Sequence, residues 1–299
     1  MINILKIILI SHLVIAEKIL NENKSSNNSS VIFLSKSTKF DYNEIENLIV
    51  FGDSHSDVNT NFTDMSYTGE NHSLGKNWPL HLIEFNKMKL WNYAVGCSPI
   101  DKKLVRFKKC YKIDLTEQFK YFYENMSKET KFYNMWNKNN SLFAIWIGNI
   151  DIWSLIIGEN EKIEIDKITN KLFEIINEMY NVGARNILIF NVFSRIYILN
   201  KNHYIKDNIQ IFNNNIIKKS EKFFKNHPDT NIIIYNTIEK LDEIVSNCEI
   251  YKLKDCNNMW KENKKNNIKD YFWINSHMSD LGNKIMAEDI NNLLNSINH

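Results

Sequence analysis

The sequence has little net charge and few glycines and prolines, the residues that are typical of turns and loops. Its formal charge at pH 7 is +2 over 299 residues, and it contains only 8 glycines and 3 prolines. So slight an excess of positive charge does not favour a nucleic-acid partner, because the lysines are spread among asparagines instead of forming one basic arm. Asn, Lys and Ile are in excess over Gly, Pro and Ala. This bias means that single surface lysines and asparagines carry little information.

No apolar run in the sequence reaches the roughly 20 residues that a membrane-spanning helix needs, so we expect no transmembrane anchor. The first residues, MINILKIILISHLVIA, place a lysine before a shorter apolar run that ends at Ala16. This pattern predicts a signal peptide over residues 1–16 and a secreted protein; a buried amphipathic helix is the alternative. Glycosylation sequons support secretion weakly in a chain so rich in asparagine, and they begin at Asn23, Asn27, Asn28, Asn61, Asn71, Asn125 and Asn139.

The four cysteines are too few and too widely spaced for a Cys-x-x-Cys metal site, so we expect no zinc. In an oxidising compartment the simplest pairing is local, Cys97 with Cys110 and Cys248 with Cys256. Four cysteines permit three connectivities, and the sequence alone does not choose among them.

Five short apolar runs recur along the chain, at residues 47–52, 89–96, 141–148, 186–193 and 231–237. They lack strict alternation, which is typical of strands that are buried on both faces of a parallel sheet. A helix of about 20 residues is predicted between the third and fourth runs, with Gly183 as its left-handed cap, and further helices near residues 205–225 and 280–297. The order predicts one α/β domain, a three-layer α/β/α sandwich around a five-stranded parallel sheet, over residues 46–299. A polar leader is expected over residues 17–45.

The segment FGDSHSD, residues 51–57, delivers a serine from a buried strand to a turn. A nucleophilic serine needs such a turn, together with a base and donors for an oxyanion. Asp and Ser are also ordinary turn formers, so this segment alone is a weak signal. Ligands of α/β sandwiches bind beyond the carboxyl ends of the strands, where Ser54, Gly96 and Gly148 are all expected.

Several ordered blocks together make the chain resemble the GDSL-type esterases and lipases of the SGNH hydrolase superfamily, with their flavodoxin-like fold, and especially the secreted fungal-type acetylesterases. The resemblance covers residue 46 to the C-terminus. The blocks are FGDSHSD, NWPLHLIEFNKMKLWNYAVGCSPID, SLFAIWIGNID, NVGARNILIFNV and FWINSHMSDLGNKIMAEDI.

The resemblance implies serine acyl transfer without a metal or organic cofactor. Ser54 stands at the nucleophile position and His277 at the base position, while the backbone N–H groups of Ser54 and Gly96 would stabilise the oxyanion with an asparagine amide. His55, beside the nucleophile, is interpreted as a flanking side chain.

The third block departs from the family pattern Gly-x-Asn-Asp, because here the asparagine comes one position early, at Asn149. Adjacent side chains on an extended segment point in opposite directions. Asn149 therefore fills the oxyanion role only if its loop bends differently; otherwise it is a loop-capping asparagine.

The last block also departs from the pattern. Ile274 stands where the family has the Asp that orients the base, and Met278 replaces the usual proline. An aliphatic side chain cannot fix the imidazole tautomer. Asn275, Asp270, Asp280 or a backbone carbonyl could take its place, and the activity is expected to be reduced or lost.

We therefore expect a secreted, monomeric esterase of small acyl groups, with acetyl groups on carbohydrate as its substrate. A lipid-directed esterase or lysophospholipase would use the same chemistry. The competing hypothesis is a binding protein on the same scaffold that has lost turnover.

Overall fold

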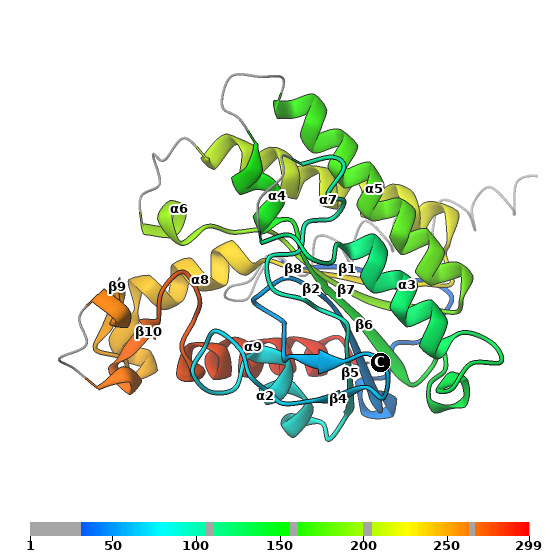
Figure 1. The fold of residues 1–299 in the computed structure, drawn as a ribbon, viewed down its shortest axis with the longest axis horizontal. Coiled ribbons are helices and arrows are strands. Elements are labelled where there is room, and N and C mark those ends of the chain that lie inside the picture. Colours follow the sequence, from blue (N-terminus) through cyan, green and yellow to red (C-terminus); the bar gives the residue numbers. More distant parts are fainter. Residues whose placement is uncertain (1–30, 106–109, 156–160, 200–204, 263–266, 299) are drawn as a thin grey trace, which may run out of the picture. The chain divides into compact units, whose positions relative to one another are not determined.

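The computed structural model describes residues 31–105, 110–155, 161–199, 205–262 and 267–298 (Figure 1). The signal peptide expected over residues 1–16, and the leader as far as residue 30, lie outside the described residues. The remaining chain, from Val31 onward, forms one compact unit.

The main sheet contains all five strands that the sequence predicts. They are β2 (Asn47–Gly52), β5 (Lys89–Asn92), β6 (Ser141–Trp146), β7 (Asn186–Phe190) and β8 (Asn231–Tyr235). They pair in parallel, and the strand order of the sheet is β1-β8-β7-β6-β2-β5. Every residue of β2, β6, β7 and β8 is buried, which explains why these runs lack polar alternation.

Among the described residues the main sheet has six strands, one more than the five parallel strands that the sequence predicts. The additional strand is β1 (Ile32–Leu34), which pairs antiparallel with β8, with Phe33 opposite Ile233. Phe40, Tyr42 and Ile45 are buried in the same core, so the folded unit includes residues 31–45, which the sequence analysis places in the leader. A three-residue strand inside a polar segment has too short a pattern to be recognised alone.

Helices cover both faces of the sheet in Figure 1, which confirms the three-layer sandwich. On one face α3 (Leu115–Met126), α5 (Glu161–Asn181) and α7 (Lys206–Asn226) pack together; on the other, α2 (Trp78–Phe85) packs against α9 (Asp280–Ser296). The buried face of α5 includes Ile168, Leu172 and Met179, and the chain turns after the helix at Gly183, where φ is +121°. At the start of α9, the Ser279 side chain accepts a hydrogen bond from the Gly282 N–H.

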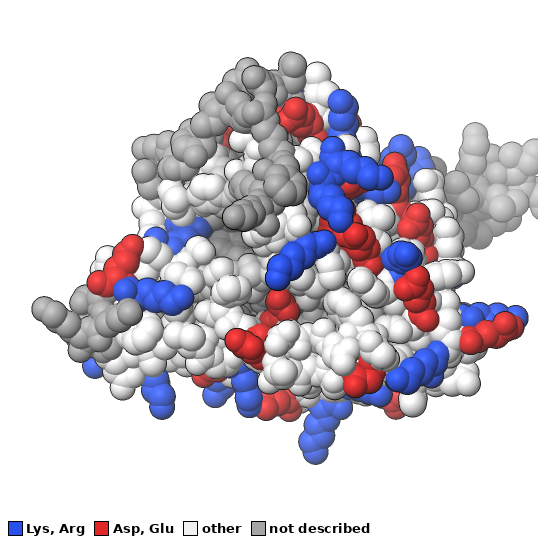
Figure 2. Space-filling model, in the orientation of Figure 1, with Lys and Arg blue, Asp and Glu red and all other residues white. Residues whose placement is uncertain are grey.

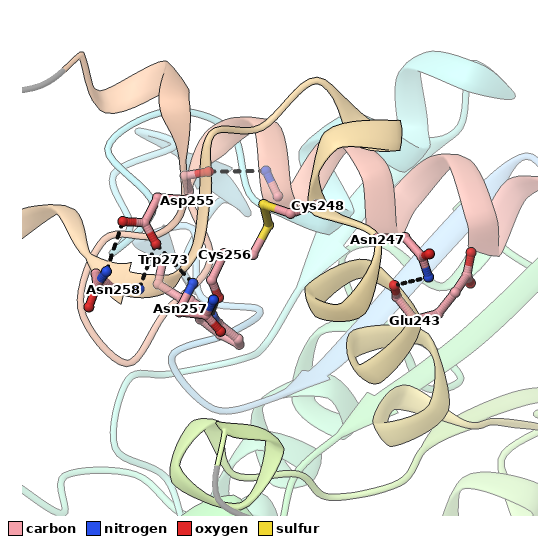
Figure 3. Close-up of a disulfide and its surroundings, with 10 residues drawn as sticks. Glu243, Asn247, Cys248, Asp255, Cys256, Asn257, Asn258 and Trp273 are labelled. Carbon is pink, nitrogen blue, oxygen red and sulfur yellow. Dashed lines mark hydrogen bonds between the residues drawn. A yellow bond between two sulfur atoms is a disulfide. The ribbon is translucent and has the colours of Figure 1, made fainter.

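Both expected cysteine pairs form disulfides, Cys97–Cys110 and Cys248–Cys256. The second joins the 3-10 helix η3 (Cys248–Tyr251), which follows α8 (Thr237–Ser246), to β9 (Asp255–Met259), as Figure 3 shows. The indole N–H of Trp273 donates to the Cys256 carbonyl oxygen at 2.8 Å. Trp273 is in β10 (Tyr271–Trp273), which pairs in parallel with β9, so this small unit fixes the segment just before His277.

The face of the molecule in Figure 2 carries lysines and arginines interspersed with acidic side chains. Such mixing agrees with the small net charge of +2. Within the ranges given above, no helix has both the length and the apolar character to span a membrane.

Candidate active site

The turn after β2 presents Ser54 at the carboxyl edge of the sheet. The absence of a side chain at Gly52 allows the end of β2 to lie close to the end of β6, because a Cβ on Gly52 would lie 2.4 Å from the Trp146 carbonyl oxygen. The Asp53 carboxylate accepts the N–H of His55 at 3.0 Å, and the Asp53 carbonyl accepts that of Ser56 at 3.0 Å. These bonds close a tight turn whose serine is only partly buried.

The Ser54 hydroxyl and the His277 imidazole meet, although 223 positions separate them in sequence. Ser54 Oγ lies 2.7 Å from His277 Nε2. His277 reaches this position from the segment between β10 and α9, and Ser54 from the end of β2. A nucleophile and its base require this separation for proton transfer.

Asn275 lies behind the imidazole and determines its tautomer. Its Oδ1 accepts the backbone N–H of His277 at 2.8 Å and lies 2.9 Å from His277 Nδ1. A backbone N–H can only donate, so the shared atom is the amide oxygen and Nδ1 must carry the proton. His277 Nε2 is then unprotonated and accepts the Ser54 hydroxyl proton. An amide can hold this tautomer but adds no negative charge to stabilise an imidazolium.

The other expected orienting groups have different partners. Asp270 Oδ2 lies 3.1 Å from Lys254 Nζ. Asp280 accepts the Lys76 backbone N–H at 2.7 Å. Ile274, at the family's Asp position, is fully buried.

Two further histidines pack on the base. The ring centroid of His277 lies 4.5 Å from that of His72 and 4.8 Å from that of His55. Burial, with smaller contributions from His55, His72 and Lys261, lowers the pKa of His277 to about 2. The imidazole is therefore neutral at neutral pH, which leaves Nε2 without a proton of its own.

His55 packs as a flanking side chain. Its ring stacks on Trp146 at 5.3 Å and lies 5.0 Å from that of Phe193. Burial lowers its pKa as well, against the opposing effect of Asp53. His55 thus belongs to the apolar wall of the site.

The Gly96 N–H lies beside the nucleophile but already has a partner. It donates to Asp57 Oδ2 at 2.7 Å. A Cβ built on Gly96 would lie 3.9 Å from Ser54 Cβ, so the glycine and the serine are neighbours.

Asn149, the first residue of α4 (Asn149–Ser154), forms hydrogen bonds that stabilise the turn that carries Ser54. Its amide donates to Asp53 Oδ2 at 3.2 Å, and its Oδ1 accepts the Phe193 N–H at 3.0 Å. Asp151 is buried and accepts the Ile100 N–H at 3.0 Å, and burial raises its pKa to about 7. None of the described hydrogen bonds joins Asn149 to Ser54.

A cavity of about 10 Å³ lies between the nucleophile loop, the loop before α2 and the start of α9. It has room for roughly one water molecule. Its lining residues are Ser54, His55, Asn71, His72, Ser73, Asn77, His277, Met278 and Asn283. A larger surface hollow of about 750 Å³ lies around Glu46 and Asn140, next to the amino ends of β2 and β6 and away from this site.

Sequence reasoning missed His72 and Asp57. Asp57 could have been noticed, because it closes the same FGDSHSD block as Ser54. His72 comes from the loop that follows the short hairpin of β3 (Thr60–Asn61) and β4 (Ser66–Tyr67), and no pattern marks it.

Comparison with known proteins gives one family and several solved structures of the same fold. The family model described as GDSL-like Lipase/Acylhydrolase matches residues 48–290. An alpha/beta hydrolase enzyme from the metagenome of Lake Arreo, Spain, is 10% identical, with a TM-score of 0.50 over 85% of this chain and 97% of its own. A catalytic mutant of an acetylxylan esterase from Geobacillus stearothermophilus is 13% identical, with a TM-score of 0.50 over 83% of this chain and 94% of its own. No curated protein sequence matches the chain.

Proposed function

Because the chain belongs to the GDSL-like lipase/acylhydrolase family, we propose that it is a secreted serine esterase that hydrolyses small acyl esters, with acetyl groups on carbohydrate as its substrate class. The observation that supports this most directly is the 2.7 Å contact between Ser54 Oγ and His277 Nε2. The amide of Asn275 completes a Ser-His-Asn arrangement.

In this mechanism His277 Nε2 takes the Ser54 proton while Ser54 Oγ attacks the ester carbonyl. The tetrahedral oxyanion would be stabilised by the backbone N–H groups of Ser54 and Gly96. His277 then protonates the departing alcohol, and a water molecule, activated by the same imidazole, releases the acid from the acyl-enzyme.

The choice of a small acyl group is supported by the narrow space around the nucleophile, where the partly open cavity of about 10 Å³ leaves no room for a long acyl chain. The acetylxylan esterase of similar fold suggests acetylated xylo-oligosaccharides as the first natural substrates to test. Secretion is supported by the apolar N-terminal sequence and by two disulfides, which persist in oxidising compartments.

A p-nitrophenyl acetate assay on the wild type and on Ser54→Ala tests the proposal. We expect the wild type to hydrolyse the ester and the variant to show only the background rate. A panel of acetylated xylo-oligosaccharide, p-nitrophenyl octanoate and lysophospholipid then separates the carbohydrate esterase from the lipid-directed one. Equal rates for Ser54→Ala and wild type would overturn the esterase proposal.

A second candidate function is binding without turnover, and one observation favours it. Two of the expected oxyanion-hole donors, the Gly96 N–H and the Asn149 amide, already donate hydrogen bonds to carboxylates. Treatment with a fluorophosphonate followed by intact-mass measurement distinguishes the two. A covalent adduct at Ser54 supports the esterase, and an unlabelled wild type supports the binding protein.

A further inference from the structure

Asp57 accepts the backbone N–H of Gly96, one of the two backbone donors that an oxyanion at Ser54 would need. Its Oδ2 lies 2.7 Å from the Gly96 nitrogen, within the 2.7–3.1 Å that an oxyanion-hole donor requires. A Cβ built on Gly96 would lie 3.3 Å from that oxygen and 3.9 Å from Ser54 Cβ. The carboxylate and the nucleophile therefore flank the same side of Gly96.

Two physical consequences follow if Asp57 is ionised. The carboxylate competes for the Gly96 N–H through a charge-assisted bond, which is stronger than a bond to a neutral acceptor. It also places a negative charge where the tetrahedral intermediate develops its own. A protonated carboxyl removes both obstacles, and a carboxylic acid that remains neutral can itself donate to an oxyanion.

On the basis of the esterase function proposed above, we propose that Asp57 gates the oxyanion hole, and that ester hydrolysis proceeds from the form of the protein in which Asp57 is protonated. The other Asp57 oxygen accepts the Asn59 N–H at 2.8 Å, which holds the carboxyl group in place in either form. The proton stays on Asp57 throughout the reaction, so the net reaction is still the conversion of ester and water into acid and alcohol.

The charged and titratable groups around the gate favour this protonation. Burial raises the pKa of Asp57 and the Asp53 charge adds to the rise, while the bonds from Asn59 and Gly96 and the charge of His72 oppose it. The pKa of His277 lies well below its usual range, so the base is already neutral at the acid pH that protonates Asp57. Activity therefore requires a pH above the pKa of His277 and below that of Asp57, and it decreases as the pH rises through the latter.

The experiment is a quenched assay of p-nitrophenyl acetate, with kcat/KM measured across pH for the wild type, Asp57→Asn and a control. The amide of Asp57→Asn cannot ionise but keeps an oxygen for the Asn59 N–H. We expect the wild type to lose about 10²-fold in kcat/KM between its acid plateau and pH ~8, the effect of losing one oxyanion donor. In Asp57→Asn, kcat/KM should show no such decrease between its own acid plateau and pH ~8.

The matched control is Asp64→Asn. Asp64 is an exposed carboxylate that accepts the Ser66 N–H at 2.9 Å, in the same kind of turn, and it does not line the cavity at Ser54. We expect its pH profile to follow that of the wild type. Melting temperatures of both variants separate lost folding from lost activity.

Three outcomes would overturn the gate. The first is a wild-type kcat/KM that rises from acid to pH ~8, and the second is an Asp57→Asn variant whose kcat/KM decreases at alkaline pH as in the wild type. The third is a folded Asp57→Asn variant whose kcat/KM is lower than that of the wild type at every pH. The last would mean that Asp57 only positions the Gly96 N–H. If Asp57→Asn fails to fold, the wild-type profile alone decides. Failure of the esterase function is recognised separately, by equal rates for Ser54→Ala and wild type at every pH.

Discussion

Replacing Asn275 by Asp should accelerate ester hydrolysis, because a carboxylate can stabilise the imidazolium that forms at His277 during attack. The geometry is already in place: Asn275 Oδ1 lies 2.9 Å from His277 Nδ1 and 2.8 Å from the His277 backbone nitrogen. Asp has the same shape, so its carboxylate can accept both N–H groups. Only the charge changes.

The magnitude follows from what Asn275 already does. A net hydrogen bond contributes about 0.5–1.5 kcal/mol between neutral groups and about 1.5–3 kcal/mol when one group is charged. The difference of about 1 kcal/mol corresponds to a gain of roughly fivefold to tenfold in kcat/KM. Loss of the correct tautomer costs a serine protease about 10⁴-fold, but the amide oxygen of Asn275 already holds that tautomer, so this larger factor is not recovered.

The pH profile gives a second readout. A carboxylate beside the imidazole raises the pKa of His277 from its lowered value, and the base acts only above its pKa. The acid limb of kcat/KM should therefore move to higher pH in Asn275→Asp. Asn43→Asp, an exposed change in the 3-10 helix η1 (Tyr42–Glu44) before β2, is the control and should leave the limb unmoved.

Asn275→Ala completes the series. It removes the acceptor for both N–H groups of His277, and we expect kcat/KM to fall by on the order of 10²- to 10⁴-fold with p-nitrophenyl acetate. The reasoning is refuted if Asn275→Ala, shown to be folded by its melting temperature, hydrolyses the ester as fast as the wild type. An unmoved acid limb in Asn275→Asp would refute it equally.

Three further changes test other parts of the site and the fold. His72→Ala should raise the pKa of His277, because the His72 charge contributes to lowering it, and the acid limb of kcat/KM should move to higher pH. Gly96→Ala should lower kcat/KM by tenfold or more with little change in melting temperature, because the new Cβ would lie 3.3 Å from Asp57 Oδ2. Cys248→Ser removes a disulfide that spans 8 positions, and the lost loop constraint predicts about 2–3 kcal/mol less stability, seen as a melting temperature lower by roughly 5–10 °C.

The central strands could be predicted because burial on both faces leaves continuous apolar runs, as in the residues of β6 and β7. β1 could not, since its three residues gain their strand character only by pairing with the edge of β8. Its position depends on tertiary contacts and not on its own pattern.

The same division applies to the site. Ser54 and His277 could be placed together because the blocks that contain them resemble the nucleophile and base blocks of the GDSL-type family, and the 2.7 Å contact between their side chains agrees with that resemblance. The partner of His277 Nδ1 stayed open among Asn275, Asp270, Asp280 and a backbone carbonyl, because the choice depends on how the turn after β10 bends. That turn is fixed by hydrogen bonds such as Ile274 N–H to the His277 carbonyl oxygen at 2.9 Å, which no spacing rule encodes.

The electrostatics of the site give a physical reason why an amide can serve behind His277. Asp53 and Asp57 already lie in the turn that carries Ser54, and Asp57 accepts the Gly96 N–H that would face the oxyanion. A carboxylate at position 275 would add a negative charge near the reacting carbonyl even when Asp57 is protonated, whereas Asn275 holds the imidazole without adding charge. The gain expected for Asn275→Asp is therefore bounded by this added charge, which also favours protonation of Asp57, and the two positions should not behave additively, because residues that share one electrostatic site couple.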